Sequence, residues 1–184
     1  MRASEVGDGN IRLSKSVIKT VVILASGSGS NAEAIARASI EKKIRVQVLS
    51  VITNVPNAGV IKRIQGLDAS IPVHVISSIG LKRKEHEIKV LEILLKLRPD
   101  WIVLAGYMRV LSKEFLEHFW DKKLNSFRVI NIHPSLLPDF PGVEAYAQAF
   151  NAGVKQTGVT VHLVTPELDA GPILEQRKFS IEDC

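Results

Sequence analysis

Apolar runs alternate with amphipathic segments along most of this 184-residue chain. Residues 20–25 form a short, continuous apolar run of the kind found in strands that are buried on both faces of a parallel sheet. Three further runs predict additional strands, at residues 46–53, 73–76 and 101–105. Helices are expected over residues 31–43, 82–98, 112–120 and 144–152.

The ends of the predicted helices carry recognisable signals. Pro99 ends the helix over residues 82–98, Ser112 caps the next helix, and Gly153 lies just beyond the last one. Within the helix over residues 82–98, four side chains fall on one side at spacings of three and four, namely Ile88, Leu91, Leu95 and Arg98. These four side chains are therefore expected to share one side of the helix.

The last third of the chain has a different pattern. Residues 159–164 alternate more regularly, which predicts a less buried strand, and residues 172–179 are expected to return beside it as a hairpin. The chain shows no repeat and no low-complexity linker. We therefore predict one α/β domain over residues 19–184, with a Rossmann-like, doubly wound, mostly parallel sheet and helices on both faces. Residues 1–18 are expected to form a flexible N-terminal extension.

Composition and charge narrow the possible functions. No stretch approaches the ~18 apolar residues that span a membrane, and the N-terminus has no secretory signal. The single cysteine, Cys184, allows no disulfide framework, so a cytoplasmic location is expected. The net charge of +5 is spread along the chain without a nucleic-acid motif, so we expect neither nucleic acid nor a membrane as partner. The excess positive charge favours attraction of an anionic substrate.

Candidate chemistry appears at the end of a further apolar run, residues 127–130. Asn131 and His133 lie two residues apart and so share one face of a strand, and Pro134 then stops the strand. Asp169 lies in a later turn segment. An amide, an imidazole and a carboxylate suit oxyanion stabilisation and proton transfer. Taken singly, His133 is more typical of a packed or solvated histidine, and Asp169 of a turn former.

A glycine–serine loop at residues 26–31 lies between the first strand and the first helix. Glycine lets the backbone approach a ligand, and the helix N-terminus offers free N–H groups to a phosphate. The spacing is not the three-glycine dinucleotide motif, and no P-loop lysine follows, so a phosphate monoester fits better. Such a loop alone is equally compatible with a simple tight turn.

Together these motifs resemble the phosphoribosylglycinamide formyltransferase family. The resemblance rests on residues 26–31, 104–111, 131–138 and 167–172, and extends from about residue 19 to the end of the chain. It implies the formyltransferase fold and transfer of a formyl group from 10-formyltetrahydrofolate, as cosubstrate, to the amino group of glycinamide ribonucleotide in purine synthesis. The Asn-x-His-Pro-Ser-Leu-Leu-Pro element alone marks only the wider superfamily.

The resemblance also implies the site residues. The reacting groups would be Asn131, His133 and Asp169. The substrate phosphate would be held by Gly29, Ser30 and Asn31. The folate pocket would be bordered by Met108, Arg109, Val110, Leu111, Thr165 and Glu167. No metal is expected, because the five histidines include no close pair of metal-ligand spacing.

Three alternatives stay open beside this interpretation. A 10-formyltetrahydrofolate hydrolase would use water as acceptor, and an initiator methionyl-tRNA formyltransferase would use a different first loop. A catalytically weak phosphate- or folate-binding protein is the third, because the family normally continues beyond the point where this chain stops. Glu144 and Pro166 also depart from the usual family residues. A homodimer is compatible with the sequence, which does not decide the oligomeric state.

Overall fold

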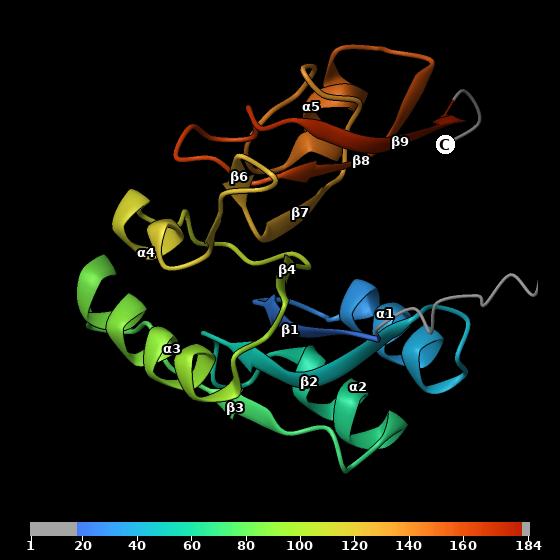
Figure 1. The fold of residues 1–184 in the computed structure, drawn as a ribbon. Coiled ribbons are helices and arrows are strands. Elements are labelled where there is room, and N and C mark those ends of the chain that lie inside the picture. The colour runs from blue at the N-terminus through green and yellow to red at the C-terminus, as the bar shows by residue number, and fades with distance from the viewer. Residues whose placement is uncertain (1–17, 182–184) are drawn as a thin grey trace, which may run out of the picture.

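The structure is a computed structural model that describes residues 18–181 (Figure 1). Its strands are β1 (Lys19–Ala25), β2 (Val46–Thr53), β3 (Val73–Val75), β4 (Trp101–Leu104), β5 (Trp120–Asp121), β6 (Ser126–Phe127), β7 (Val129–His133), β8 (Gln156–Leu163) and β9 (Ile173–Ser180). Its helices are α1 (Ser30–Ile40), α2 (Gly59–Leu67), α3 (Arg83–Leu97), α4 (Lys113–Glu117) and α5 (Ala145–Asn151). Apart from Ile18, the predicted N-terminal extension lies outside the described residues, as does Cys184.

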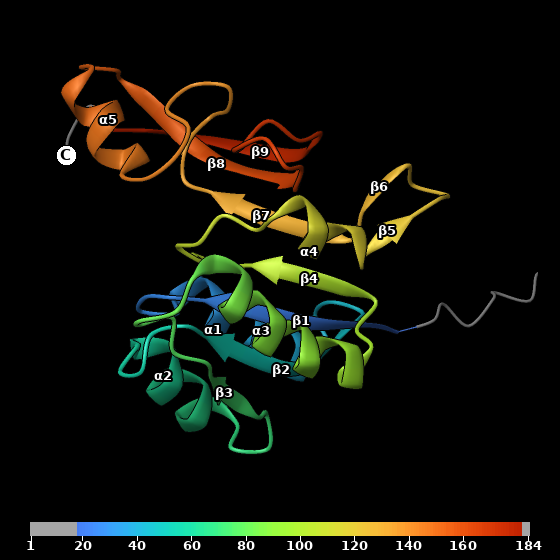
Figure 2. The ribbon, with the colours of Figure 1, turned by 90° about the vertical axis from the view of Figure 1, so that its left-hand side faces the viewer.

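Seven strands form one sheet in the order β3-β2-β1-β4-β7-β8-β9. The first five of these run parallel, whereas β8 is antiparallel to β7 and β9 to β8. Figure 2 shows the strands stacked edge to edge, with β8 reversed. The predicted α/β fold and its mostly parallel sheet are confirmed, as is the terminal hairpin. The strand order reverses between β1 and β4, which is where open α/β sheets bind their ligands.

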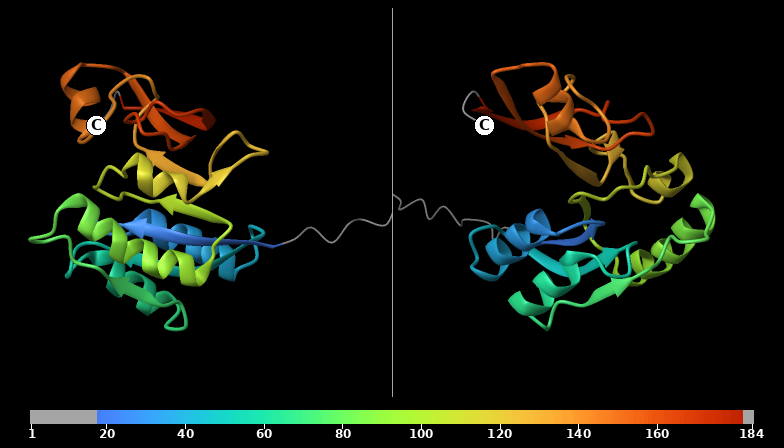
Figure 3. Two further views of the ribbon diagram at one scale, coloured as in Figure 1. Left: turned by 60° about the vertical axis from the view of Figure 1, so that its left-hand side comes forward. Right: turned by 180° about the vertical axis from the view of Figure 1, so that it is seen from behind.

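Helices cover both faces of the sheet (Figures 1 and 3). Alternate residues of β1 point to opposite faces, so Val21 and Ile23 pack with α1 and α2 while Val22 and Leu24 pack with α3 and α4. All four side chains are buried. The continuous apolar run of β1 therefore reflects burial on both faces, as its sequence predicted.

Of the four residues spaced along one side of α3, only Leu91 packs against the core. Ile88 and Leu95 are each 49% exposed, and Arg98 follows the helix in a left-handed conformation. The helix instead buries its His86, Glu87, Val90 and Leu94 side. Burial of the two polar residues is possible because each has a hydrogen-bond partner, which apolar periodicity cannot reveal.

Two short elements were not predicted. Helix α2 begins at a glycine, contains a second glycine at position 66 and buries only Val60 and Ile64, so its periodic signal is short. The β5–β6 hairpin interrupts the segment between α4 and β7 with strands of two residues each. Helix α4 is correspondingly shorter than the predicted segment over residues 112–120.

Candidate active site

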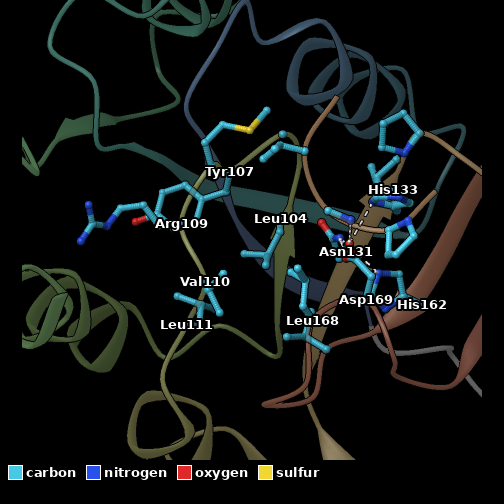
Figure 4. A pocket seen from close by; sticks show the side chains of 18 of the residues that line it. Leu104, Tyr107, Arg109, Val110, Leu111, Asn131, His133, His162, Leu168 and Asp169 are labelled. Carbon is cyan, nitrogen blue, oxygen red and sulfur yellow. Dashed lines mark hydrogen bonds and ion pairs between the residues drawn. The ribbon is translucent and has the colours of Figure 1, made fainter. Parts of the chain in front are cut away.

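A cavity of about 480 Å³ opens beside the carboxyl ends of β4 and β7. Four chain segments line it: residues 104–111 after β4, residues 131–134 of β7 and its end, residues 141–148 around the start of α5, and residues 162–169 at the end of β8. Figure 4 shows that Asn131, His133, His162 and Asp169 gather on one side of this cavity. The other side is largely apolar, with Leu104, Val110 and Leu168.

Pairing of β7 with β8 places Asn131 directly opposite His162. The two side chains meet, with 3.1 Å between Asn131 Nδ2 and His162 Nε2. His162 Nδ1 lies 2.9 Å from the carbonyl oxygen of Leu163 and so carries the proton that bonds to it. His162 Nε2 can then accept a hydrogen bond from the Asn131 amide. This bond orients the Asn131 side chain in the cavity.

Asp169 joins the strand residues from the turn after β8. Its Oδ2 atom accepts a hydrogen bond from the Gly142 amide at 2.7 Å and lies 3.4 Å from His133 Nδ1. Its Oδ1 atom lies 3.3 Å from Asn131 Nδ2 and 3.5 Å from His162 Nε2. The three residues expected to react therefore form one cluster, although Asp169 is 36 positions from His133 in sequence.

Asp169 is held as a carboxylate. Burial would raise the pKa of Asp169, but the adjacent His162 ring, the hydrogen bond from the Gly142 amide and the nearby His133 ring hold this pKa below its ordinary value. The Asp169 side chain is only 7% exposed. A fixed negative charge therefore lies against His133 in a site with little solvent screening.

His133 is buried, with 3% of its surface exposed. Its Nε2 atom lies 2.9 Å from the carbonyl oxygen of Phe140 and must donate to it, because a carbonyl only accepts. The neutral ring then presents the lone pair of Nδ1 to the Asp169 carboxylate. Only a protonated ring could donate to Phe140 O and to Asp169 at once.

The six residues expected to border the folate all line the cavity: Met108, Arg109, Val110, Leu111, Thr165 and Glu167. Leu111 is buried and also belongs to the core beneath α3 and α4, whereas Met108 is 68% exposed. In Figure 4 the Arg109 side chain extends away from the Asn131–Asp169 cluster. Tyr107, which the sequence did not single out, also lines the cavity, and burial raises the pKa of its phenol. This side offers a slot for a flat ring.

The residues expected to hold a phosphate lie at the N-terminus of α1 and do not line the cavity itself. Gly29 precedes the helix with φ 83°, and a Cβ atom there would lie 2.5 Å from Val60 Cα, so only glycine fits. Ser30 and Asn31 are exposed in the first turn, which no side chain caps. The loop adjoins the cavity because Ser26 N donates to Gly106 O at 3.0 Å.

The sequence leaves His162 open between a supporting partner of the reacting groups and an ordinary strand histidine. In the structure His162 is 2% exposed and contacts both Asn131 and Asp169. Its position two residues after Thr160, which is also buried, was the available signal, because both lie on one face of β8. The hydroxyl of Ser26, in the same glycine–serine loop, donates to Asn54 Oδ1.

Neither a metal centre nor a membrane span is found within residues 18–181. Over this part of the chain, no three or more histidine, cysteine, aspartate or glutamate side chains are grouped so as to hold a metal ion. None of the helices in the same range has the length and apolar character needed to cross a membrane.

Comparisons with known proteins agree with this geometry. The chain is 38% identical to phosphoribosylglycinamide formyltransferase of Escherichia coli over 162 residues, covering 88% of this chain and 73% of that protein. It is 36% identical to formyltetrahydrofolate deformylase of Haemophilus influenzae, covering 94% and 59%. The structure of phosphoribosylglycinamide formyltransferase from Bacillus halodurans matches with a TM-score of 0.81 and 41% identity, covering 90% and 81%.

The sequence pattern of the family described as formyl transferase matches residues 19–183. The resemblance expected from the glycine–serine loop and the Asn131–Pro138 segment is thereby confirmed. With its cavity at the strand ends and this match over nearly all of its length, the chain belongs to the formyl transferase family.

Proposed function

We propose that this protein transfers the formyl group of 10-formyltetrahydrofolate to the amino group of glycinamide ribonucleotide. The observation that carries this proposal is the contact of Asn131, His133 and Asp169 at the edge of an apolar slot, beside an uncapped helix N-terminus. The slot suits the folate ring and the helix end suits a phosphate. The relatives named phosphoribosylglycinamide formyltransferase support the choice of acceptor.

In the proposed reaction, the substrate amine attacks the formyl carbon and forms a carbon–nitrogen bond. The carbonyl oxygen becomes an oxyanion, which Asn131 and protonated His133 stabilise by hydrogen bonds. The carbon–N10 bond of the folate then breaks. The proton lost by the amine reaches N10 of the folate, relayed by the His133–Asp169 pair through water.

The oxyanion has to compete with protein acceptors for these donors. The contacts of Asn131 Nδ2 with His162 and Asp169 measure 3.1 and 3.3 Å, at the long end of the hydrogen-bond range. His133 Nε2 lies 2.9 Å from Phe140 O, a neutral acceptor that an oxyanion outcompetes. Asp169 remains against His133 Nδ1 and stabilises its charge throughout.

The two substrates are proposed to bind on either side of this cluster. Gly29, Ser30 and Asn31 would hold the phosphate through backbone N–H groups at the α1 N-terminus. Glu33 lies in that first turn, but Arg37 and Arg63 pair with it at 2.9 and 2.8 Å and offset its charge. The folate would lie against residues 108–111 and residues 165–167, which both contribute to the lining of the cavity.

Hydrolysis is the second candidate, favoured by the match to formyltetrahydrofolate deformylase. The same oxyanion donors would serve an attack by water. The exposed glycine–serine loop before α1 argues against hydrolysis, because a hydrolase has no phosphate to bind beside the cavity. The acceptor therefore separates the two functions.

The decisive experiment follows loss of the formyl group from 10-formyltetrahydrofolate with and without glycinamide ribonucleotide. Dependence on the ribonucleotide, with formylated ribonucleotide as product, is expected. Equal loss without the ribonucleotide would identify a hydrolase instead. Binding of both ligands without turnover would identify a binding protein and overturn the proposed enzyme activity.

A further inference from the structure

One buried side chain connects the phosphate loop to the folate segment without lining the cavity. Ser26 is the residue between β1 and Gly27, and it is 8% exposed. Its backbone N–H donates to Gly106 O at 3.0 Å, and its hydroxyl oxygen accepts from the Met108 amide at 2.8 Å. Ser26 therefore makes two hydrogen bonds to the chain that leaves β4.

The hydroxyl of Ser26 is itself held in place. Its proton is donated to Asn54 Oδ1 at 2.5 Å, and Asn54 lies just beyond the end of β2 with 6% of its surface exposed. Asn54 Nδ2 donates in turn to Ser78 Oγ at 3.1 Å, and the Ser78 amide donates to Asn54 O at 3.1 Å. The amide orientation of Asn54 is thus fixed, and the lone pairs of Ser26 face Met108.

We propose that Ser26, oriented by Asn54, is a positioning residue that holds the folate-binding segment 106–111 in its binding conformation against the phosphate loop. The proposal rests on the folate pocket named under the proposed function. Three strands meet in this contact, because Ser26 follows β1, Asn54 follows β2 and Gly106 follows β4. It lies at the point where the strand order reverses. The pairing of β1 with β4 continues into this contact, because the Ala105 amide donates to Leu24 O at 2.9 Å.

The physical reason is preorganisation. Without the Ser26 hydroxyl, the Met108 amide loses its acceptor and Asn54 Oδ1 loses its donor. Residues 106–111 would then also occupy other conformations. The apparent folate affinity falls in proportion to the fraction of molecules that keep the binding conformation. Loss of one such buried hydrogen bond corresponds to about a tenfold change in affinity.

The test uses the full chain and two readouts. Ser26→Ala is expected to raise the Kd for 5-formyltetrahydrofolate about tenfold, measured by calorimetry, and to raise the KM for 10-formyltetrahydrofolate in parallel. The KM for glycinamide ribonucleotide should change by less than about threefold, because the Gly29 backbone is kept in place by α2. Ser26→Thr, which keeps the hydroxyl, should restore most of the folate affinity.

The matched control is Ser50→Ala. Ser50 is fully buried on the neighbouring strand β2, and its hydroxyl donates to Pro72 O at 2.9 Å, away from the cavity. Ser50→Ala should lower the thermal midpoint as Ser26→Ala does, but leave the folate Kd unchanged. A folate Kd for Ser26→Ala within twofold of the wild-type value would overturn the proposal and leave Ser26 a purely stabilising residue.

If Ser26→Ala does not fold, Asn54→Ala provides the second variant. It removes the acceptor that orients the Ser26 hydroxyl and is expected to weaken folate binding in the same direction; an unchanged Kd would count against the proposal. Wild-type protein that binds 5-formyltetrahydrofolate but shows no ribonucleotide-dependent transfer would refute the proposed function alone. Wild-type protein that binds no folate would overturn the pocket assignment and this inference together.

Discussion

Replacement of Asp169 by asparagine removes the charge of this residue and keeps its shortest hydrogen bond, the one from Gly142. The side-chain oxygen of the introduced asparagine can still accept from the Gly142 amide, which lies 2.7 Å from Oδ2 of Asp169. Asp169 has φ 51°, a left-handed conformation that asparagine tolerates as well as aspartate does. The fold around the turn should therefore survive, while the negative charge beside His133 is lost.

The expected fall in kcat follows from the distance between His133 and Asp169. At the 3.4 Å between His133 Nδ1 and Asp169 Oδ2, two opposite unit charges interact by about 5 kcal/mol at an effective dielectric constant of ~20. Desolvation of the two buried groups offsets roughly half of this energy. About 2–3 kcal/mol of stabilisation of the imidazolium should be lost, which corresponds to roughly a 10²-fold fall in kcat.

The assay is steady-state formyl transfer with both substrates saturating, together with thermal unfolding of each variant. Asp139→Asn is the matched control, because Asp139 is an exposed carboxylate on the loop that leads into the cavity wall. Its kcat should stay within twofold of wild type. A kcat for Asp169→Asn within about threefold of wild type, at an unchanged thermal midpoint, would refute the assigned role of the carboxylate.

The same pair of proteins tests the charge state of Asp169. Because the pKa of Asp169 is lowered in the folded protein, the unfolded chain binds the proton more readily, and the stabilisation is fully present above the ordinary pKa of 3.8. This stabilisation is lost as the pH falls through the folded-state pKa. The stability difference between wild type and Asp169→Asn should therefore be constant near neutral pH and shrink below about pH 4.

Three further changes test other parts of the structure. Gly29→Ala should destabilise the fold by about 1–3 kcal/mol and weaken binding of glycinamide ribonucleotide, because the added Cβ would meet the Val60 backbone. Gly27→Ala, whose Cβ meets nothing within 4 Å, should change neither stability nor binding. Thermal unfolding measures the stability and calorimetry the binding. Burial holds the pKa of His86 below 6.5, so unfolding free energy should fall as the pH drops below 6.5, and His86→Gln should remove this slope in urea titrations. Glu87→Ala removes the carboxylate that accepts from the Ser112 amide at 2.8 Å, so it should lower the free energy of unfolding by about 2–3 kcal/mol, measured by urea unfolding. Glu114→Ala, at an exposed position of α4, should have a negligible effect.

The sequence predicted those parts of the fold whose signal is local. The continuous apolar run of β1 and the Pro99 and Ser112 signals each depend on a few neighbouring residues, and all agree with the structure. The apolar spacing along α3 does not reveal the burial of His86 and Glu87, because this burial depends on partners ten and twenty-five positions away. Periodicity measures apolar character and is blind to such pairs.

The candidate site likewise contains residues that the sequence could group and residues whose contacts only the fold reveals. Asn131 and His133 could be grouped because they lie two positions apart on one strand, and a period of two needs no knowledge of the fold. His162 could not be assigned, because its contact with Asn131 depends on the register between β7 and β8. The role of Ser26 could not be predicted, since only the structure shows that its hydroxyl faces Asn54 and Met108.

The position of Asp169 depends on a combination of features that no single motif encodes. Reversal of β8 sends the chain away from the site, since Leu163 pairs with Ile130 near the start of β7. The chain returns because the turn closes tightly on the strand: Leu163 N donates to Pro172 O at 2.9 Å, and a Cβ atom on Gly171 would collide with Leu163 O. Gly142 then fixes the carboxylate from the opposite wall. The Asp-Ala-Gly-Pro turn therefore reaches the candidate site because its glycine has no side chain, which is a packing requirement rather than a chemical one.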